Sequence, residues 1–375
     1  MISFWEKNSF LNYDTIVIGG GFNGLSAACA IKEKYPKQNI LILERGSWPF
    51  GASTRNAGFA CFGSFAEIRS DIQSNGLDLA LQLIEMRNRG LEIHKKRIGE
   101  EQMGYEKTGG GEFIFKDESF FEDEVREMNH HLSSIFKTEV FKIENDKISE
   151  NGFNRNDLNV FISNFCEGQV DTGKFMLNLW QYAMSLGVKI MTGITVESIE
   201  DLPASCNVIA QHNRFDETVN FTCEQCVVCT NAFSKTFFPD FDIHPGRGQI
   251  LATKPIPGLK FKGIFHFREG YYYFRNYGER IIFGGGRNED IKGEETTDIE
   301  INTEIKNSLD HYLKTLIIPE VEYEVDCRWA GIMAFGTDKL PIIERVSNRV
   351  IAGVRMGGMG VALSGITSQK IAEMI

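Results

Sequence analysis

The sequence lacks both a surplus of positive charge and an apolar segment long enough to span a membrane. Its 375 residues include 40 Lys and Arg against 51 Asp and Glu, a net charge of -11 that argues against a nucleic-acid or anionic-membrane partner. The longest uncharged run, residues 15–31, is short and contains three consecutive glycines and Asn23. The first twelve residues lack the apolar core of a secretory signal. We therefore expect a cytoplasmic protein with no stable membrane insertion.

A convincing set of metal ligands is also missing. Cys223, Cys226 and Cys229 have CxxCxxC spacing, which raises the question of a metal or iron–sulfur site. No compact fourth Cys or His follows, and the surrounding letters, FTCEQCVVCTNA, are typical of a buried strand. Because free cysteine is among the most buried residue types, we interpret the three as strand residues and expect no metal.

The N-terminal part contains a nucleotide-binding pattern. Residues 15–30, TIVIGGGFNGLSAACA, are a β-branched run, then Gly19, Gly21 and Gly24 in G-x-G-x-x-G spacing, then small helix formers. This order predicts a strand, a tight turn and a helix. Such glycines allow a positive φ and bring the backbone close to a pyrophosphate, which then faces the free N–H groups of the helix.

A second short strand strengthens this interpretation. Residues 40–43 are apolar and end in Glu44, twenty residues beyond Gly24. A carboxylate at this place accepts hydrogen bonds from ribose hydroxyls and repels a 2′-phosphate. The pattern predicts a dinucleotide site, and on these residues alone NAD and FAD are equally possible.

The remaining patterns predict an α/β fold (α+β overall) with two domains. Helix-to-strand units at the start, in the middle and at the end enclose two insertions, one of which, residues 263–287, has the aromatic pattern of antiparallel strands. We expect a discontinuous, Rossmann-like nucleotide-binding domain carrying an inserted substrate domain on a mainly antiparallel sheet. The predicted segments are 1–98, 165–242 and 326–375 for the first domain, and 99–164 and 243–325 for the second.

Residues 44–64, ERGSWPFGASTRNAGFACFGS, carry the most specific signal. They resemble the flavin-binding region of the FAD-dependent D-amino-acid oxidase family, in the branch of glycine, sarcosine and γ-glutamylputrescine oxidases, where a G-A-S-x-x-N-x-G loop wraps the FAD. The resemblance continues through GVKIMTGITVESI, PGRGQILATKPI, YYYFRNYGERIIFGGG, RWAGIMAFGTDKLPII and GGMGVALSG. It implies that the first domain binds FAD.

The resemblance and the glycine patterns together predict the FAD-binding residues. The C-terminal glycines precede a helix starting near Val361, whose N-terminus would stabilise the anionic reduced flavin at its N1–C2=O edge. The predicted residues are Gly19, Gly21, Phe22, Asn23, Gly24, Glu44, Arg45, Ser53, Thr54, Arg55, Asn56, Ala57, Gly58, Val196, Thr230, Asn231, Gly331, Gly357, Gly358, Met359, Gly360 and Val361.

The sequence departs from the family at the substrate anchor. Amino-acid oxidases of the family often have the sequence G-L-R-P here, and its arginine binds the substrate carboxylate. In this chain the sequence is Gly331-Ile332-Met333, so Met333 stands in place of that arginine. A buried carboxylate without a paired cation is disfavoured, so Met333 favours an amine without an α-carboxylate if no other arginine enters the pocket. Arg287 and Arg275 are the candidate replacements, although both could equally form structural salt bridges.

Two further departures concern the flavin. Relatives with covalent FAD attach it through a cysteine near the position of Gly331, whereas Cys327 lies four residues away, so we expect noncovalent FAD. The lysine that activates O₂ in sarcosine oxidases is matched by Ile282, which leaves O₂ and another electron acceptor both open.

The resemblance implies oxidation of the C–N bond of a small amine or amino acid, with hydride transfer to flavin N5 and hydrolysis of the imine. We assign Tyr272, Arg287 and Met333 to the substrate site. Because alternate residues of a strand face opposite sides, either Tyr272 or the pair Tyr271 and Tyr273 faces the pocket, and we favour Tyr272. The alternatives are an FAD-dependent hydroxy-acid or alcohol dehydrogenase and a non-catalytic flavoprotein subunit.

Overall fold

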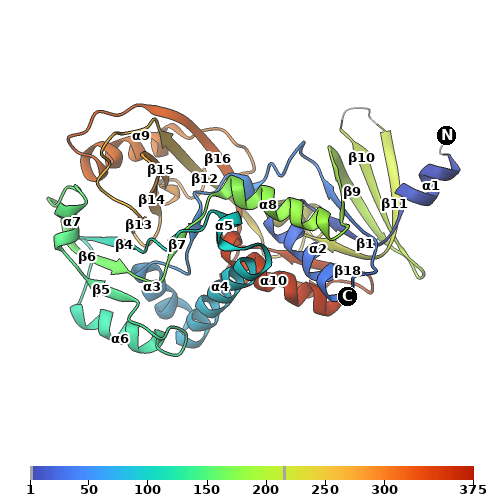
Figure 1. Cartoon of the computed structure of the whole chain (residues 1–375), viewed down its shortest axis with the longest axis horizontal. Coiled ribbons are helices and arrows are strands. Elements are labelled where there is room, and N and C mark those ends of the chain that lie inside the picture. Colours follow the sequence, from blue (N-terminus) through green and yellow to red (C-terminus); the bar gives the residue numbers. More distant parts are fainter. Residues whose placement is uncertain (1–2, 214–216) are drawn as a thin grey trace.

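The computed structural model describes residues 3–213 and 217–375 and contains two large sheets at opposite ends of an elongated molecule (Figure 1). The first sheet has the strand order β17-β18-β11-β1-β2-β8, with β10 on β11 and β9 on β10. Its strands are β1 (Asn12–Ile18), β2 (Ile40–Glu44), β8 (Lys189–Thr192), β9 (Ile194–Asp201), β10 (Cys206–His212), β11 (Glu217–Val228), β17 (Ile342–Arg345) and β18 (Val350–Val354).

The second sheet has the order β16-β12-β15-β14-β13-β4-β6-β5. Its strands are β4 (Gly110–Phe115), β5 (Phe141–Ile143), β6 (Leu158–Asn164), β12 (His244–Thr253), β13 (Ile264–Phe267), β14 (Tyr272–Tyr277), β15 (Arg280–Gly285) and β16 (Val325–Phe335), and a small pair is formed by β3 (Phe59–Ala60) and β7 (Gly168–Gln169). All its pairings are antiparallel except that of β13 with β4.

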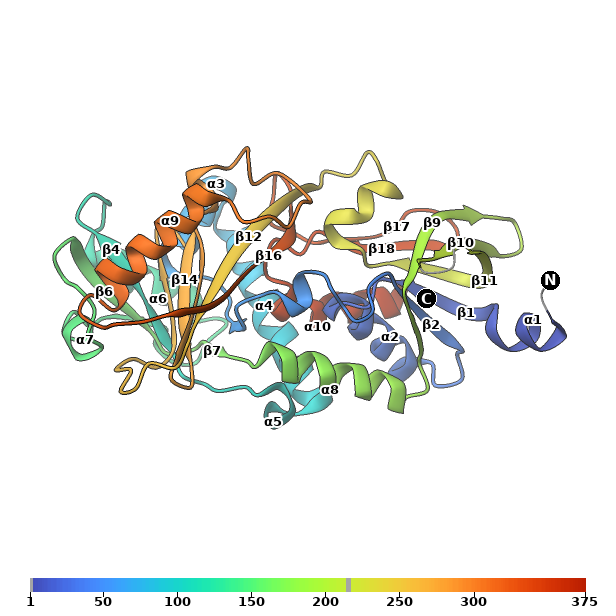
Figure 2. The ribbon, with the colours of Figure 1, turned by 90° about the horizontal axis from the view of Figure 1, so that it is seen from above.

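Helices cover both sheets (Figures 1 and 2). The α-helices are α1 (Phe4–Phe10), α2 (Phe22–Lys34), α3 (Phe65–Asn75), α4 (Leu77–Ile98), α5 (Glu100–Met103), α6 (Glu122–Leu132), α7 (Asp146–Glu150), α8 (Thr172–Ser185), α9 (Thr303–Tyr312) and α10 (Gly360–Met374). Short 3₁₀ turns occupy Ala52–Thr54, Asn231–Thr236 and Arg287–Glu289, and a π turn occupies Leu313–Ile317. In the described part of the chain, no helix is long and apolar enough to cross a membrane.

The predicted βαβ unit is confirmed. β1 pairs in parallel with β2 on one side and with β11 on the other, and β11 pairs in parallel with β18. β1 and β2 are buried almost throughout, as expected for parallel strands covered on both faces. The first sheet thus takes its strands from the beginning, the middle and the end of the chain, which confirms the discontinuous architecture.

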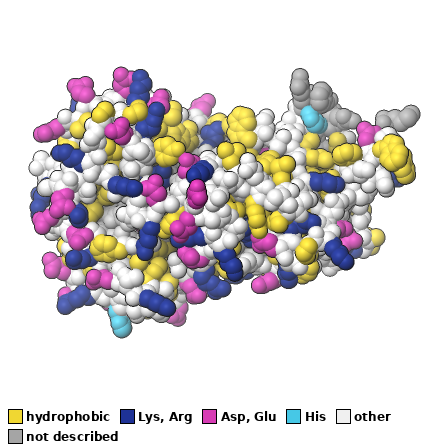
Figure 3. All heavy atoms as spheres, in the orientation of Figure 1, with side chains coloured by type: hydrophobic (Ala, Val, Ile, Leu, Met, Phe, Trp, Pro, Cys, Tyr) yellow, Lys and Arg dark blue, Asp and Glu magenta, His cyan; other side chains and the backbone are white. Residues whose placement is uncertain are grey.

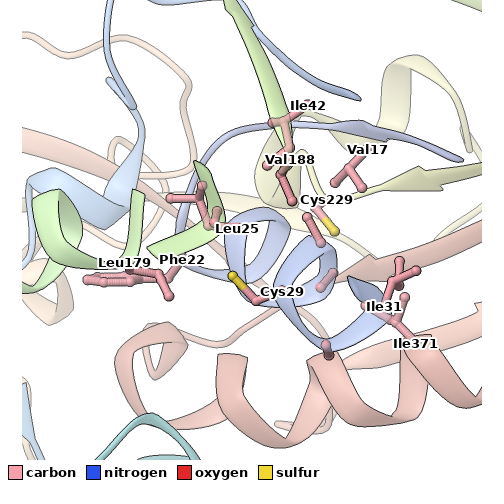
Figure 4. Packing of buried hydrophobic residues seen from close by; sticks show 14 of the residues in the cluster. Val17, Phe22, Leu25, Cys29, Ile31, Ile42, Leu179, Val188, Cys229 and Ile371 are labelled. Carbon is pink, nitrogen blue, oxygen red and sulfur yellow. The ribbon is translucent and has the colours of Figure 1, made fainter. Parts of the chain in front are cut away.

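The core of the first sheet lies between its strands and helices α2, α8 and α10. Figure 4 shows Val17 and Ile42 from the strands facing Leu25 of α2, with Leu179 of α8 and Ile371 of α10 closing the cluster. α2 and α10 lie side by side (Figure 2). This packing fixes the N-termini of both helices, on which the functional site depends.

The second sheet has an aromatic core on one face. Phe265, Phe267, Tyr272, Phe274 and Phe283 are wholly or almost wholly buried, and they pack under the segment that contains α9. β16 pairs with β12 along most of its length, so residues 326–335 lie in the second sheet and not in the first, where the predicted division put them. We propose that the two sheets mark the two domains, with the last boundary following β16.

Candidate active site

A cavity of about 780 Å³ connects the carboxyl ends of the parallel strands with one face of the second sheet. Most of the predicted cofactor residues line it: Gly19, Gly21, Phe22, Asn23, Glu44, Arg45, Ser53, Arg55, Asn56, Ala57, Val196, Thr230, Asn231, Gly331, Gly357, Gly358, Met359, Gly360 and Val361. Gly24, Thr54 and Gly58 do not line the cavity, so the expectation that they contact the cofactor is not supported by the geometry. They shape the loops behind its wall.

The glycine turn after β1 has no room for side chains. Gly19 has a φ of +103°, a conformation that other residues rarely adopt. A methyl group at Gly24 would lie 1.8 Å from the Gly19 carbonyl oxygen, and one at Gly21 would lie 2.7 Å from Ser53 Oγ. Gly21, the N-cap residue of α2, has no side chain that could cap the helix, and Ser53 Oγ accepts only the Phe22 N–H of this helix end. The other N–H groups of the first turn are available to a ligand in the cavity.

Glu44 lies at the end of β2 and is 7% exposed. Its Oε2 accepts a hydrogen bond from the Gly20 N–H at 2.9 Å, and its Oε1 accepts one from the Gly46 N–H at 2.8 Å. Each carboxylate oxygen has a second lone pair. The carboxylate therefore braces the glycine turn and still presents acceptor capacity to the cavity.

The loop 51–58 is fastened to helix α2 and to the second sheet. Ser53 Oγ accepts a hydrogen bond from the Phe22 N–H of α2 at 2.9 Å. On the other side, Arg55 Nη1 donates to the carbonyl oxygen of Ala330 in β16 at 2.7 Å. The loop thus forms a wall of the cavity where the two sheets meet.

Two further elements complete the nucleotide side. Thr230 Oγ1 is buried and has no hydrogen-bond partner among the described residues, which is the state expected of a hydroxyl that awaits a ligand. Gly357 and Gly358, with φ of +55° and +78°, lead into α10, whose N-terminus likewise has no side-chain cap. The positive end of the α10 dipole is therefore available to an anionic group.

The opposite wall is one face of the second sheet. Mostly alternate residues line the cavity: Gly248 and Ile250 of β12, His266 of β13, Tyr273 of β14, Gly285 of β15, and Gly331, Met333 and Phe335 of β16, with Ile332 between them and Tyr271 just before β14. This is the period of two that a strand imposes on its side chains.

The prediction that Tyr272 faces the pocket is wrong. Tyr272 is fully buried on the opposite face, its ring stacked on Phe267 with 4.8 Å between centroids. Its hydroxyl bonds Glu289 Oε1 at 2.7 Å and Ser308 Oγ at 2.6 Å, and burial raises its pKa. Tyr271 and Tyr273 line the cavity instead, and burial raises the pKa of Tyr273 to about 12, so its hydroxyl is protonated at neutral pH.

Of the candidate anchors, Arg287 and Met333 lie in the cavity wall, whereas Arg275 does not. Arg275 is buried behind the wall, where its Nη1 donates to the carbonyl oxygens of Gly58 and Val170, each at 2.7 Å. Its role is to tie β14 to the loops of the nucleotide side. Burial lowers the pKa of Arg275 to about 10.

Arg287 has the environment of a ligand-binding cation. Its guanidinium carbon lies 4.2 Å from the centre of the Phe335 ring, and none of the described carboxylates forms an ion pair with it. Met333 packs close to the beginning of α10, since a methyl group built on Gly358 would lie 3.2 Å from its sulfur. The two side chains come from neighbouring parts of the same wall.

A charged cluster that the sequence did not indicate borders the cavity. Lys339 Nζ lies 3.0 Å from Glu67 Oε1 and 2.7 Å from Asp71 Oδ1. Burial by itself raises the pKa of Glu67, but Lys339 and Arg87 outweigh it and hold this pKa at about 2. Glu67 is therefore ionised. Lys339 lies far from Glu67 and Asp71 in the sequence, and the packing of α3, which carries both acidic residues, brings the three together.

His266 was also missed. It is 8% exposed, lines the cavity, and its Nε2 has no hydrogen-bond partner within residues 3–213 and 217–375. Burial lowers its pKa to about 4, so the imidazole is uncharged at neutral pH. A polar residue in the apolar strand GIFHF, between two phenylalanines, was the available signal.

The cysteines lie away from the cavity except for Cys61 and Cys229. Cys223 and Cys226 are buried in β11, and Cys229 follows directly, which confirms the strand prediction. In the described part of the chain, no group of three or more His, Cys, Asp or Glu is arranged to hold a metal ion. Cys327 is exposed on β16 and is not part of the cavity wall.

A cavity with a nucleotide-binding turn on one side and an aromatic sheet on the other is that of a two-domain oxidoreductase with a dinucleotide cofactor. Comparison with known families fixes the cofactor. Residues 14–374 match the family of FAD dependent oxidoreductases (DAO), and the chain belongs to this family. Its cofactor is FAD.

Known relatives are moderately similar. OrdL from Haemophilus influenzae, a probable oxidoreductase, is 25% identical over 387 residues, with 96% of this chain and 82% of OrdL covered. The gamma-glutamylputrescine oxidoreductase of Escherichia coli is 34% identical over 111 residues, 30% of this chain and 26% of that protein. The bifunctional protein ThiO/ThiG of Nostoc is 27% identical over 215 residues, 56% of this chain and 31% of its own length.

Two solved structures share the fold. Glycine oxidase from Geobacillus kaustophilus has a TM-score of 0.76 at 18% identity, covering 97% of this chain and 95% of that chain. L-proline dehydrogenase from P. horikoshii also has a TM-score of 0.76, at 17% identity, with 97% and 93% covered. The sequence prediction of fold class and cofactor is therefore confirmed.

The residues of the cavity fit FAD. The turn of three glycines, Gly19–Gly21, has room for a pyrophosphate, and Glu44 offers acceptors for ribose hydroxyls. Thr230 has a hydroxyl without a partner, and the uncapped N-terminus of α10 suits the negative charge that a flavin ring gains on reduction.

Proposed function

We propose that the chain oxidises the C–N bond of a small amino acid to an imine, which water then hydrolyses. Bound FAD supplies the acceptor for the two electrons. The observation that carries the proposal is Arg287, a guanidinium in the cavity wall that has no carboxylate partner in the described chain. A substrate carboxylate would complete its coordination as a charge-assisted, bidentate pair.

Arg287 also bears on what Met333 implies about the substrate. Met333 in place of the family arginine favours an amine without an α-carboxylate only if no other arginine reaches the pocket. Arg287 lies in the same wall, beside Phe335, and supplies that cation. We therefore propose an amino acid as substrate, with Met333 as an apolar contact.

The side chains of the second sheet bind and desolvate the substrate. Arg287 orients it through the carboxylate, while Ile250, Met333 and Phe335 exclude water from the reacting centre. The hydroxyl of Tyr273 is a neutral hydrogen-bond donor at the same face. Positioning and exclusion of water are what the protein contributes to a reaction whose chemistry belongs to the cofactor.

An anaerobic spectral screen tests the proposal. The purified holoprotein is mixed with amino acids, their decarboxylated amines and the matching hydroxy acids, and bleaching of the flavin absorbance is followed. Bleaching by amino acids supports it. Bleaching only by hydroxy acids would instead favour an alcohol-oxidising enzyme, since Arg287 would bind their carboxylate equally well.

The electron acceptor is tested in the same experiment. Admitting O₂ to the bleached protein, or adding a dye, shows which of the two restores the absorbance. Because Ile282 stands where sarcosine oxidases have the lysine that activates O₂, we propose either O₂ or another electron acceptor.

A further inference from the structure

Three cysteines that the proposed function does not use lie together in the first sheet. Cys206 is the first residue of β10 and stands directly opposite Cys223 in the antiparallel pairing of β10 with β11. Both side chains are buried, in the same hydrophobic cluster as Cys226, and none of the three lines the cavity. The fold thus brings thiols together without forming a metal site in the described part of the chain.

The positions of Cys206 and Cys223 fit a disulfide. Directly opposite residues of antiparallel strands have Cα atoms about 4.5–5.5 Å apart, and a disulfide joins Cα atoms about 4.4–6.8 Å apart. Val208 and Phe221, the next inward-facing pair along the two strands, belong to the same cluster, so both cysteine side chains point to the same face. A bond between the two sulfurs therefore needs no change in the strand pairing.

Cys206 lies close to the surface although its own side chain is covered. Residues 202–204, which precede β10, are exposed. Figure 3 shows fewer charged side chains at this end of the molecule than over the second sheet, which fits an uncharged oxidant. A small opening of the chain before β10 is enough to admit such a molecule to Cys206.

Arg349 places positive charge beside both cysteines. Its Nη2 donates to the carbonyl oxygen of Pro203 at 3.0 Å, on the segment before Cys206. Its Nη1 donates to the carbonyl oxygen of Glu224 at 3.1 Å, in the residue after Cys223. A guanidinium next to a cysteine favours the thiolate, which is the reactive form of the side chain.

Cys206 is the most easily ionised of the three thiols. Hydrogen bonds from the thiols of Cys223 and Cys226 lower the pKa of Cys206, and Arg349 lowers it further, while burial and Asp201 act in the opposite direction. The hydrogen bond to Cys206 raises the pKa of Cys223 and of Cys226, and burial adds to this. The cluster therefore contains one thiolate and two thiols that keep their protons.

We propose that Cys206 and Cys223 are a redox-active dithiol, which hydrogen peroxide oxidises to a disulfide between β10 and β11. The Cys206 thiolate attacks one peroxide oxygen, so that an S–O bond forms, the O–O bond breaks and hydroxide leaves. Hydroxide takes up the proton that Cys206 released on ionisation. The Cys223 sulfur then displaces the hydroxyl group from Cys206, which leaves as water with the Cys223 proton, and the S–S bond forms. The two sulfurs lose two electrons, and peroxide is reduced to water.

The disulfide connects two segments that reach the cavity. β9, which pairs with β10, carries Val196 in the cavity wall, and β11 leads to Thr230 in the same wall. The bond ties β10 to β11 between these segments and restricts the unfolded chain, so the oxidised protein gains stability. Peroxide is also the product that a reduced flavin releases when O₂ reoxidises it.

Peptide mapping of the holoprotein tests the proposal. The purified protein is treated with hydrogen peroxide, its free thiols are alkylated, and the chain is digested with a protease that cleaves after Glu. Cleavage after Glu217 and Glu224 puts Cys206, Cys223 and Cys226 on three different peptides. We expect mass spectrometry to find the Cys206 peptide linked to the Cys223 peptide in most chains, and dithiothreitol to separate them. A link from Cys206 to Cys226 instead, or no link, overturns the proposal.

Two variants test the roles of the sulfurs. Cys223→Ala should abolish the link to β11 position 223 and leave Cys206 oxidised, as a sulfenic acid that dimedone traps or as a link to Cys226. An unoxidised Cys206 in this variant would refute its role as the attacking thiol. Cys327→Ser, which removes the exposed thiol of β16, is the control and should keep the link. Loss of the link in this control would assign the disulfide to exchange through Cys327.

Thermal denaturation gives an independent measure. The Tm of the oxidised wild type should lie about 5 °C above that of the reduced protein, and peroxide should not raise the Tm of Cys223→Ala. A fall in the Tm of the wild type on oxidation would show that the strands do not accommodate the bond, which overturns the proposal. None of these measurements uses a substrate, so their failure leaves the proposed function standing.

Discussion

The Glu44 carboxylate holds the glycine turn in place, since its Oε2 accepts a hydrogen bond from the Gly20 N–H at 2.9 Å. A second bond, from the Gly46 N–H, fixes the other oxygen. This side chain therefore holds the shape of the turn, and we propose that it also binds the ribose of FAD.

Replacing Glu44 should weaken FAD binding. A hydrogen bond to a charged group contributes roughly 1.5–3 kcal/mol, so Glu44→Ala should lower FAD affinity about ten- to a hundredfold. Glu44→Gln keeps one acceptor oxygen and should lose less. The Kd is measured by flavin fluorescence on apoprotein reconstituted with FAD. Glu197→Ala, at an exposed site on β9, is the control, and an unchanged Kd in Glu44→Ala would leave the carboxylate with a bracing role only.

The purified protein should be yellow, and heat or acid should release intact FAD into the supernatant. Gly331 lines the cavity near the position where relatives with covalent FAD have the attaching cysteine. Cys327, the nearest cysteine in sequence, is exposed and lies outside the cavity wall. The measurement is the absorbance of supernatant and pellet after precipitation. Colour that stays with the precipitated chain would contradict noncovalent binding while leaving the family intact.

Arg287→Met should remove the preference for carboxylated substrates. We expect wild type to oxidise an amino acid with a higher kcat/KM than the amine formed by its decarboxylation. The variant should lose about ten- to a hundredfold on the amino acid and little on the amine, because only the amino acid pairs with the guanidinium. Arg280→Met, which removes an arginine bonded to the Thr253 carbonyl outside the cavity, is the control. Equal losses on both substrates would refute the anchor.

Tyr273→Phe should affect catalysis, whereas Tyr272→Phe should affect stability. Tyr273→Phe removes a hydroxyl from the cavity wall and should lower kcat/KM without a large change in Tm. Tyr272→Phe removes two buried hydrogen bonds, to Glu289 and Ser308, and should lower the stability by about 1–3 kcal/mol with little kinetic effect. Steady-state kinetics and thermal denaturation of both variants check this. A kinetic defect confined to Tyr272→Phe would contradict the assigned faces.

Glu167→Gln should be more stable than wild type at high pH. Glu167 is buried, and burial raises its pKa to about 8, above that of an unfolded chain. A raised pKa in the folded state means that the stability contribution is complete below about pH 4 and is lost as pH rises through 8. Glutamine mimics the protonated acid and can still accept from Phe62 and Gly63, because both N–H groups bond Oε1.

The measurement is Tm from pH 5 to 9. The Tm of wild type should fall a few degrees below that of Glu167→Gln as pH rises. A difference between the two that does not change with pH would show that Glu167 has the same charge in the folded and unfolded chains.

The nucleotide half of the site was predictable because its residues are contiguous. The glycine turn, Glu44 and the loop at 51–58 each occupy a short stretch whose local conformation is set by its own residues. The second sheet was harder, because its site residues come from separate strands and meet only through strand pairing. Glu67 and Lys339 are 272 positions apart, and no local pattern relates them.

The facing of the three tyrosines, Tyr271 to Tyr273, follows from the residues after them. Tyr272 is followed two places later by Phe274, and Tyr273 by Arg275. Because side chains alternate along a strand, Tyr272 faces the same side as Phe274 and packs with it in the aromatic core. Three consecutive tyrosines do not by themselves show which of them faces the core.

The interleaving of segments in the first sheet sets when the cofactor can be acquired. β1 lies between β2 and β11, β11 pairs with β18, and α10 packs against α2. The wall around the flavin is therefore incomplete until the last helix has been synthesised and has folded back onto the first. FAD binding becomes a late event in biogenesis, and a chain that stops before β18 is predicted to remain colourless however well its N-terminal glycine turn is formed.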